Sequence, residues 1–185
     1  MPKFELKNYV TDHFIETGTQ AGKGCASAIA AGFKRVSSIE VYPETFESAK
    51  SNLDIFQDCF GLEINLHLGD SEDILPEILK ETQDRCTFWL DAHIHRSWGR
   101  SRCGKNWCPL YHELEAIRNH SRNDHIIMID DVRLIGHKRK GARSWGTSNV
   151  NMDGVLERLQ SINNKYEFIY EGGCEPNDCL VAYVK

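Results

Sequence analysis

The stretch HFIETGTQAGKG, residues 13–24, places a short apolar segment directly before a turn that contains Gly18, Gly22 and Gly24. Glycine suits a turn that needs a positive φ or that brings the backbone close to a ligand. From the second of these glycines onward, residues 22–32 have the apolar spacing of a helix. The stretch therefore predicts a strand over 13–16, a tight turn and a helix, which is the repeating unit of parallel sheets.

The same alternation recurs along the chain and predicts an α/β fold. We expect strands at 13–16, 36–40, 64–68, 87–91 and 125–130, and helices at 22–32, 43–59, 72–81, 110–120 and 152–163. Two further strands, 166–171 and 179–184, are joined by GGCEPND, which is too short for a crossover helix, so they should run antiparallel. The expected fold is one domain over 1–185. It is a doubly wound, Rossmann-like seven-stranded sheet, with five parallel strands, a C-terminal antiparallel hairpin and helices on both faces.

The composition favours a cytoplasmic protein. No apolar stretch approaches the roughly 20 residues that cross a bilayer, and MPKFELKNYV does not resemble a signal peptide. Seven cysteines without a signal peptide are better interpreted as mostly reduced thiols. The formal net charge of -5 gives no reason to expect general affinity for nucleic acids.

Acidic residues stand at or just after the ends of all five strands that should be parallel. Sheets of this kind bind ligands at the carboxyl ends of their strands, so these acids are candidate site residues. The alternative is that they cap the helices that follow, because Asp and Glu favour helix N-termini. The acids are Glu16, Glu40, Asp70, Asp91 and the pair Asp130 and Asp131.

The glycine turn suits a nucleotide-like ligand but lacks the patterns of two phosphate-binding motifs. It is not a P-loop, because Lys23 comes one place early and Gly24 follows it. It also departs from G-x-G-x-x-G, because Gln20 takes the place of the second glycine. A cofactor without phosphate fits better.

These features resemble the class I S-adenosylmethionine-dependent methyltransferases, whose first motif is acid-x-G-x-G-x-G. Glu16, Gly18 and Gly22 match that motif, and Gln20 departs from it. The resemblance implies that Glu40 binds the ribose hydroxyls of S-adenosylmethionine and that Asp70 lies beside the adenine. The implied cofactor-binding residues are Glu16, Gly18, Thr19, Gln20, Gly22, Glu40, Val41, Asp70, Ser71 and Asp91.

The chain further resembles the divalent-metal-dependent O-methyltransferases, which include catechol-type and macrolide-sugar enzymes. The segments that carry this resemblance are FWLDAH, CPLYHEL and IIMIDDVR. By position, the metal ligands implied are Asp91, Asp130 and Asp131, and three carboxylates suit a hard cation such as Mg²⁺. The alternative for the aspartate pair is one helix cap and one salt bridge to Arg133 or Arg139.

In the enzymes that the chain resembles, the metal holds the hydroxyl of the acceptor and a nearby base removes its proton. His93 and His95 follow Asp91 closely, and these three residues are the candidates for catalytic groups. Either histidine could be the base. Either could instead be a metal ligand, because Asp91-x-His93-x-His95 also suits a transition metal.

Two windows without acids, 92–112 and 132–152, follow strands that should border the site. Their basic residues favour a small anionic acceptor, such as a sugar or nucleotide derivative, unless they form solvated loops. Two other functions stay open. The basic loops and their tryptophans could hold RNA for methylation, or the fold could bind a nicotinamide cofactor.

The cysteines allow one more alternative. Cys103 and Cys108 share a C-x₄-C spacing with Cys174 and Cys179, so a structural zinc site would form if the two loops met. Free thiols are the competing interpretation.

Overall fold

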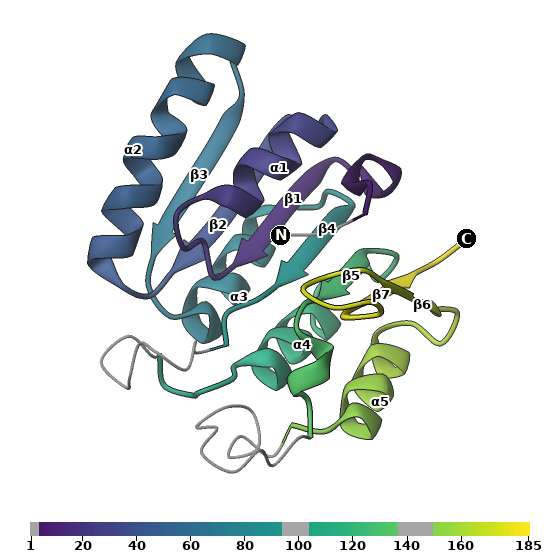
Figure 1. Cartoon of the computed structure of the whole chain (residues 1–185). Helices are drawn as coiled ribbons and strands as arrows, with labels where there is room; N and C mark the ends of the chain where they lie inside the picture. The colour runs from purple at the N-terminus through teal and green to yellow at the C-terminus, as the bar shows by residue number, and fades with distance from the viewer. Residues whose placement is uncertain (1–3, 94–103, 137–149) are drawn as a thin grey trace.

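The computed structural model describes residues 4–93, 104–136 and 150–185, and Figure 1 shows its arrangement. Seven strands form one sheet in the order β3-β2-β1-β4-β5-β7-β6. The first five strands run parallel, and β7 pairs antiparallel with both β5 and β6. The strands are β1 (His13–Thr17), β2 (Arg35–Glu40), β3 (Glu63–Leu68), β4 (Cys86–Leu90), β5 (Ile126–Ile129), β6 (Glu167–Glu171) and β7 (Cys179–Tyr183).

Helices cover both faces of the sheet because the strands are apolar on both sides. Side chains alternate along β1, so Ile15 packs in the core under α3, α4 and α5, whereas Phe14 packs in the core under α1 and α2. The helices are α1 (Lys23–Ala31), α2 (Pro43–Phe60), α3 (Ser71–Glu81), α4 (Leu110–Arg118) and α5 (Met152–Ile162), with 3₁₀ turns η1 (Leu6–Tyr9) and η3 (Val132–Leu134). The predicted fold class is confirmed.

The strand register brings the carboxyl ends of β1, β2 and β4 to the same edge. Thr17 at the end of β1 pairs with Ile39 of β2 on one side and with Leu90 of β4 on the other. The chain order reverses between β1 and β4, and such a switch point is where doubly wound sheets bind ligands.

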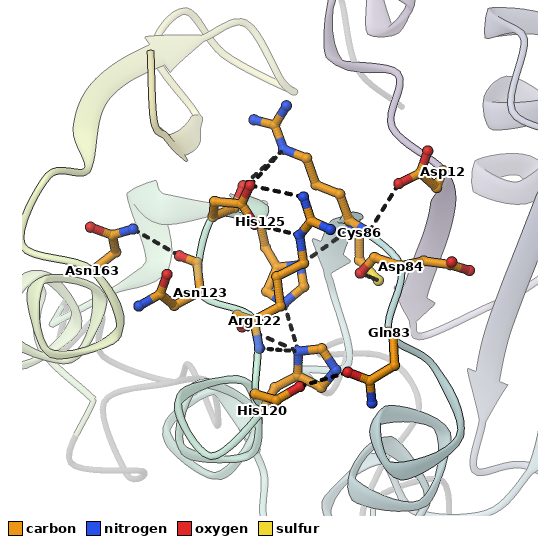
Figure 2. Close-up of polar contacts among 12 residues, drawn as sticks. Asp12, Gln83, Asp84, Cys86, His120, Arg122, Asn123, His125 and Asn163 are labelled. Atoms are coloured by element: carbon orange, nitrogen blue, oxygen red, sulfur yellow. Dashed lines mark hydrogen bonds and ion pairs between the residues drawn. The ribbon is translucent and has the colours of Figure 1, made fainter.

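The opposite, amino edge of the sheet carries a chain of hydrogen bonds through two histidines (Figure 2). The Cys86 N–H donates to Nδ1 of His125 at 3.0 Å, so Nε2 of His125 carries the proton and donates to Nδ1 of His120 at 3.0 Å. Nε2 of His120 then donates to the Thr82 carbonyl at 3.0 Å. Burial, with His120 beside it, lowers the pKa of His125 to about 4. The ring of His125 is therefore neutral in this arrangement.

Among the described residues, no helix combines the length and the apolar character that crossing a membrane requires.

Candidate functional site

The glycine turn after β1 packs directly against the end of β4. Gly18 has a φ of +86°, and its N–H donates to the Ile39 carbonyl at 2.9 Å. A Cβ atom on Gly18 would lie 2.4 Å from the carbonyl oxygen of Asp91, so only glycine allows this approach. The turn also contacts β2, because the N–H of Gln20 donates to Oε2 of Glu40 at 2.9 Å. One short turn thus joins three strand ends.

Glu16 lies beneath the turn, and its carboxylate is hydrogen-bonded to other groups of the protein. Its Oε2 accepts hydrogen bonds from the Ser38 hydroxyl at 2.6 Å and from the Cys25 thiol at 3.1 Å. Gly24 is equally constrained, because a Cβ atom there would lie 1.6 Å from Oε1 of Glu16. Burial raises the pKa of Glu16 to about 7. The first acid of the motif therefore joins β1 to β2 and to the first turn of α1.

Glu40 presents its carboxylate at the end of β2. Its two oxygens accept the N–H groups of Gln20 and Tyr42, each at 2.9 Å. Burial raises the pKa of Glu40, and these N–H groups oppose the shift. Each carboxylate oxygen can accept more than one hydrogen bond. Glu40 can therefore still accept hydrogen bonds from a diol.

Asp70 caps the helix that follows it. Its Oδ1 accepts the Glu72 N–H at 3.0 Å, and its Oδ2 accepts the Lys105 N–H at 2.6 Å. A Cβ atom on Gly104 would lie 2.3 Å from Oδ2 of Asp70, so residues 104 and 105 pack closely on this carboxylate. The helix-cap alternative thus describes the hydrogen bonds of Asp70. Its place beside adenine stays a prediction.

A cavity lies at this edge of the sheet, at the switch point where doubly wound sheets bind ligands. Of the predicted cofactor-binding residues, those that line it are Gly18, Gln20, Glu40, Val41, Asp70, Ser71 and Asp91. Glu16 and Thr19 line a second cavity instead. Gly22 lines neither cavity and faces α2, since a Cβ atom there would lie 2.9 Å from Leu53.

His93 lies between two of the predicted metal ligands. Its Nδ1 is 3.3 Å from Oδ1 of Asp91, and its Nε2 is 3.0 Å from Oδ2 of Asp131. Burial lowers the pKa of His93, but Asp131 and Asp91 outweigh it and leave the pKa raised. Burial also raises the pKa of Asp91, to about 8, although His93 opposes it. The ligand atoms of these three residues lie within 4.8 Å of one another.

Asp130 is adjacent to this cluster in sequence but is not one of its members. Its residue is 7% exposed, and its Oδ1 has no hydrogen-bond partner among the described residues. Burial raises the pKa of Asp130, as does the neighbouring Asp131. The side chains of Asp130 and Asp131 have different surroundings because the backbone of Asp131 adopts a left-handed conformation, with a φ of +55°. The sequence therefore placed three carboxylates together, whereas the structure groups two of them with a histidine.

Arg133 pairs with Asp131, which is the salt bridge of the alternative interpretation, and also with Asp178. Asp178 is buried, and its Oδ2 accepts the Cys174 N–H at 3.1 Å. Asp178 therefore fixes the loop between β6 and β7 beside the end of β5. Cys174, which is exposed and forms no disulfide with another described residue, lies in this loop.

The second cavity, of about 310 Å³, adjoins the first. Both are lined by Gly18, Gln20, Asp91 and His93. The second alone is lined by Lys23, Asp130, Asp131, Arg133 and Cys174. Asp91 and His93 thus line both cavities, whereas Asp131 lines the second.

Glu113 is a buried acid that sequence reasoning missed. It lies in α4, is 1% exposed and interacts with the hydroxyls of Thr17 and Ser71. Burial raises its pKa to about 7, against the effect of those hydroxyls. Its Oε1 has no partner among the described residues. The available signal was its place at i+3 in the apolar stripe that begins at Leu110.

Several predicted residues lie outside the described ranges. They include His95, Cys103, Trp98, Trp145 and most basic residues of the two windows. Of the other cysteines of the zinc alternative, Cys108 is buried and belongs to none of the candidate metal clusters of the described residues. Cys174 falls in a cluster with Asp131 and Asp178, whose carboxylates Arg133 already contacts.

No family model matches the chain, and no curated protein matches it by sequence. Solved structures do match. An O-methyltransferase from Bacillus cereus in complex with S-adenosylhomocysteine is 18% identical, with a TM-score of 0.60, and covers 97% of this chain and 77% of its own. TomG, the O-methyltransferase of tomaymycin synthesis from Streptomyces achromogenes, in complex with S-adenosylmethionine, is 19% identical, with a TM-score of 0.54 and coverage of 97% and 76%.

The chain has a class I methyltransferase fold. Its matches include the N-methyltransferase NodS from Bradyrhizobium japonicum, which is 13% identical, with a TM-score of 0.55, and covers 98% of this chain and 90% of its own. The methyltransferase fold therefore accommodates different acceptor atoms, and the acceptor has to be argued from the site itself.

Proposed function

We propose that the chain is an S-adenosylmethionine-dependent O-methyltransferase that uses a divalent cation and acts on a hydroxyl of a small acceptor. One observation carries the proposal. The cavity lined by Glu40, Asp70 and Ser71 shares Asp91 and His93 with the second cavity. A cofactor in the first space and an acceptor in the second would meet beside these two residues.

The side chains of the first cavity suit the cofactor. Glu40 would accept hydrogen bonds from the ribose diol, because a carboxylate offers two acceptor oxygens. The backbone turn at Gly18 would let the sulfonium end of the cofactor approach closely. The Asp70 carboxylate and the Ser71 hydroxyl would border the adenine.

The residues at the boundary suit a cation. Asp91 and Asp131 offer carboxylate oxygens. Next to them lies the buried carboxylate of Asp130, whose Oδ1 has no hydrogen-bond partner within the part of the chain that the structure describes. When bound, S-adenosylmethionine supplies the methyl group, and the cation lowers the pKa of the acceptor hydroxyl. His93 is the described candidate for the base that takes the hydroxyl proton, and His95 is the other candidate.

The second cavity is lined by Lys23, whose ammonium would pair with a negative group on the acceptor, although Glu16 and the three aspartates line it as well. Arg133 lines it too, but its guanidinium already contacts Asp131 and Asp178. A sugar or nucleotide derivative with a phosphate or carboxylate would fit this chemistry.

Titration calorimetry with S-adenosylmethionine, S-adenosylhomocysteine and NAD tests the proposed function. We expect both methyltransferase ligands to bind and NAD not to bind. Binding of NAD alone would replace the proposal with a nicotinamide-binding function. Once an acceptor is found, excess chelator should abolish turnover and leave S-adenosylhomocysteine bound. Full turnover in chelator would remove the cation from the mechanism.

A further inference from the structure

The ring of His93 faces a carboxylate at each of its nitrogens. Nδ1 lies 3.3 Å from Asp91 and Nε2 lies 3.0 Å from Asp131. A neutral imidazole carries one N–H and one lone pair, so it can donate to only one of these carboxylates. The other nitrogen would then direct its lone pair at an oxygen. Either a second proton or a metal cation must lie in this space to offset that repulsion.

The separations suit a cation. Two donors that sit about 2.1 Å from one ion at right angles are about 3.0 Å apart. Nε2 of His93 and Oδ2 of Asp131 are 3.0 Å apart. The donor atoms of Asp91, His93 and Asp131 all lie within 4.8 Å of one another, as ligands of a single ion do.

A separate observation also points to a cation. Oδ1 of Asp130 is buried without a hydrogen-bond partner among the described residues, and the side chain lines the same cavity as Asp91, His93 and Asp131. A buried, unpartnered carboxylate oxygen is costly. The guanidinium of Arg133 is shared between Asp131 and Asp178, and a dication would offset the charge that remains on the aspartates of this site.

We infer that His93, together with Asp91 and Asp131, binds this cation, and that the centre takes a transition-metal dication in preference to Mg²⁺. Imidazole nitrogen suits ions such as Co²⁺, Zn²⁺ and Fe²⁺, whereas Mg²⁺ prefers oxygen donors. Asp130 lies outside this ligand set and contributes its charge. The inference rests on the proposed function for the role of the cation in turnover. As a ligand, His93 would not be the base.

The first test uses the full chain after removal of metals with a chelator. Co²⁺, Mn²⁺ and Mg²⁺ are titrated separately by calorimetry, and the visible absorption of Co²⁺ is recorded. We expect Co²⁺ to bind at least tenfold more tightly than Mg²⁺. Equal affinities for Co²⁺ and Mg²⁺ would overturn the inference, and so would the absence of any binding at millimolar metal.

The second test compares His93→Ala with Asp130→Asn and with a matched control, His112→Ala, whose side chain is 61% exposed. His93→Ala should weaken Co²⁺ at least tenfold, shift its absorption bands and change Mg²⁺ affinity less than threefold. Asp130→Asn should weaken Co²⁺ less than His93→Ala does, and the control should match the parent. A His93→Ala chain that binds Co²⁺ with unchanged affinity and spectrum refutes the ligand assignment.

S-adenosylhomocysteine binding by each variant checks folding and separates the two proposals. If S-adenosylhomocysteine binds but no metal does, the inference fails and the methyltransferase proposal stands. If metal binds through His93 but S-adenosylhomocysteine does not bind, the proposed function fails and the metal site stands.

Discussion

The N–H of Gln20 donates to the carboxylate of Glu40 across 2.9 Å, although the two residues are twenty positions apart in the chain. Gln20 adopts a φ of +48° to make this contact. The place where the sequence departs from the glycine motif is thus a direct link between the turn after β1 and the end of β2. Glu40 both shapes the turn and faces the first cavity.

Glu40→Ala should weaken binding of S-adenosylhomocysteine severely. The loss of a charged acceptor from a buried diol costs about 1.5–3 kcal/mol, which is roughly tenfold to more than a hundredfold in affinity. Glu44→Ala, an exposed acid in the first turn of α2, is the matched control. Calorimetry gives the comparison, and a folded Glu40→Ala chain with parental affinity would remove Glu40 from the cofactor site.

Gly18→Ala should destabilise the fold more than Gly61→Ala. Both glycines have a positive φ, but a Cβ atom meets nothing within 4 Å at Gly61, whereas at Gly18 it meets the Asp91 carbonyl. The conformational strain costs about 1–2 kcal/mol at each position, and the clash adds about 1–3 kcal/mol at Gly18. Urea unfolding measures both changes. Equal losses would mean that the turn can move away from β4 freely.

Glu113→Gln should gain stability relative to the parent as the pH rises. The pKa of Glu113 is raised from 4.5 to about 7 by burial, so between these values the folded parent holds a proton that the unfolded chain releases. The parent therefore loses up to about 1.4 kcal/mol per pH unit in this window, and the glutamine variant does not. Parallel stability curves for the two chains between pH 4.5 and 7 would contradict this assignment.

The His125→Asn variant, at the amino edge of the sheet, should gain stability relative to the parent as the pH falls. The pKa of His125 is lowered from 6.5 to about 4, so the unfolded chain takes up the proton first as the pH falls. A proton on Nδ1 would also face the Cys86 N–H. The parent should thus lose up to about 1.4 kcal/mol per pH unit between pH 6.5 and 4 relative to the variant. Thermal unfolding across this range tests the sign, and a constant difference between the chains would be incompatible with a neutral buried ring.

The fold could be predicted from the sequence because its signals are local. The strand expected at 36–40 is β2 (Arg35–Glu40), and the loop GGCEPND joins two antiparallel strands as its length requires. Apolar runs, glycine turns and connection lengths each act over a few residues. Together they leave few topologies for a chain of this kind.

The site could be predicted only in part, because its contacts join distant segments. The acids at the strand ends do gather at one edge, but the sequence does not reveal that Asp70 uses both oxygens on backbone N–H groups. Nor does it reveal that His93 inserts between Asp91 and Asp131. Two consecutive aspartates also need not converge, since adjacent side chains diverge and the conformation of Asp131 decides its direction.

The position of Cys174 gives the unknown acceptor an experimental handle. Of the described cysteines, Cys25, Cys86, Cys108 and Cys179 are buried, whereas Cys174 is exposed at the second cavity. A library of small electrophilic fragments should therefore label Cys174 in preference to those four thiols. Intact-mass spectrometry would rank the fragments by how well their non-reactive parts fit the surrounding space. The chemistry of the best fragments would then guide the choice of natural acceptors to assay.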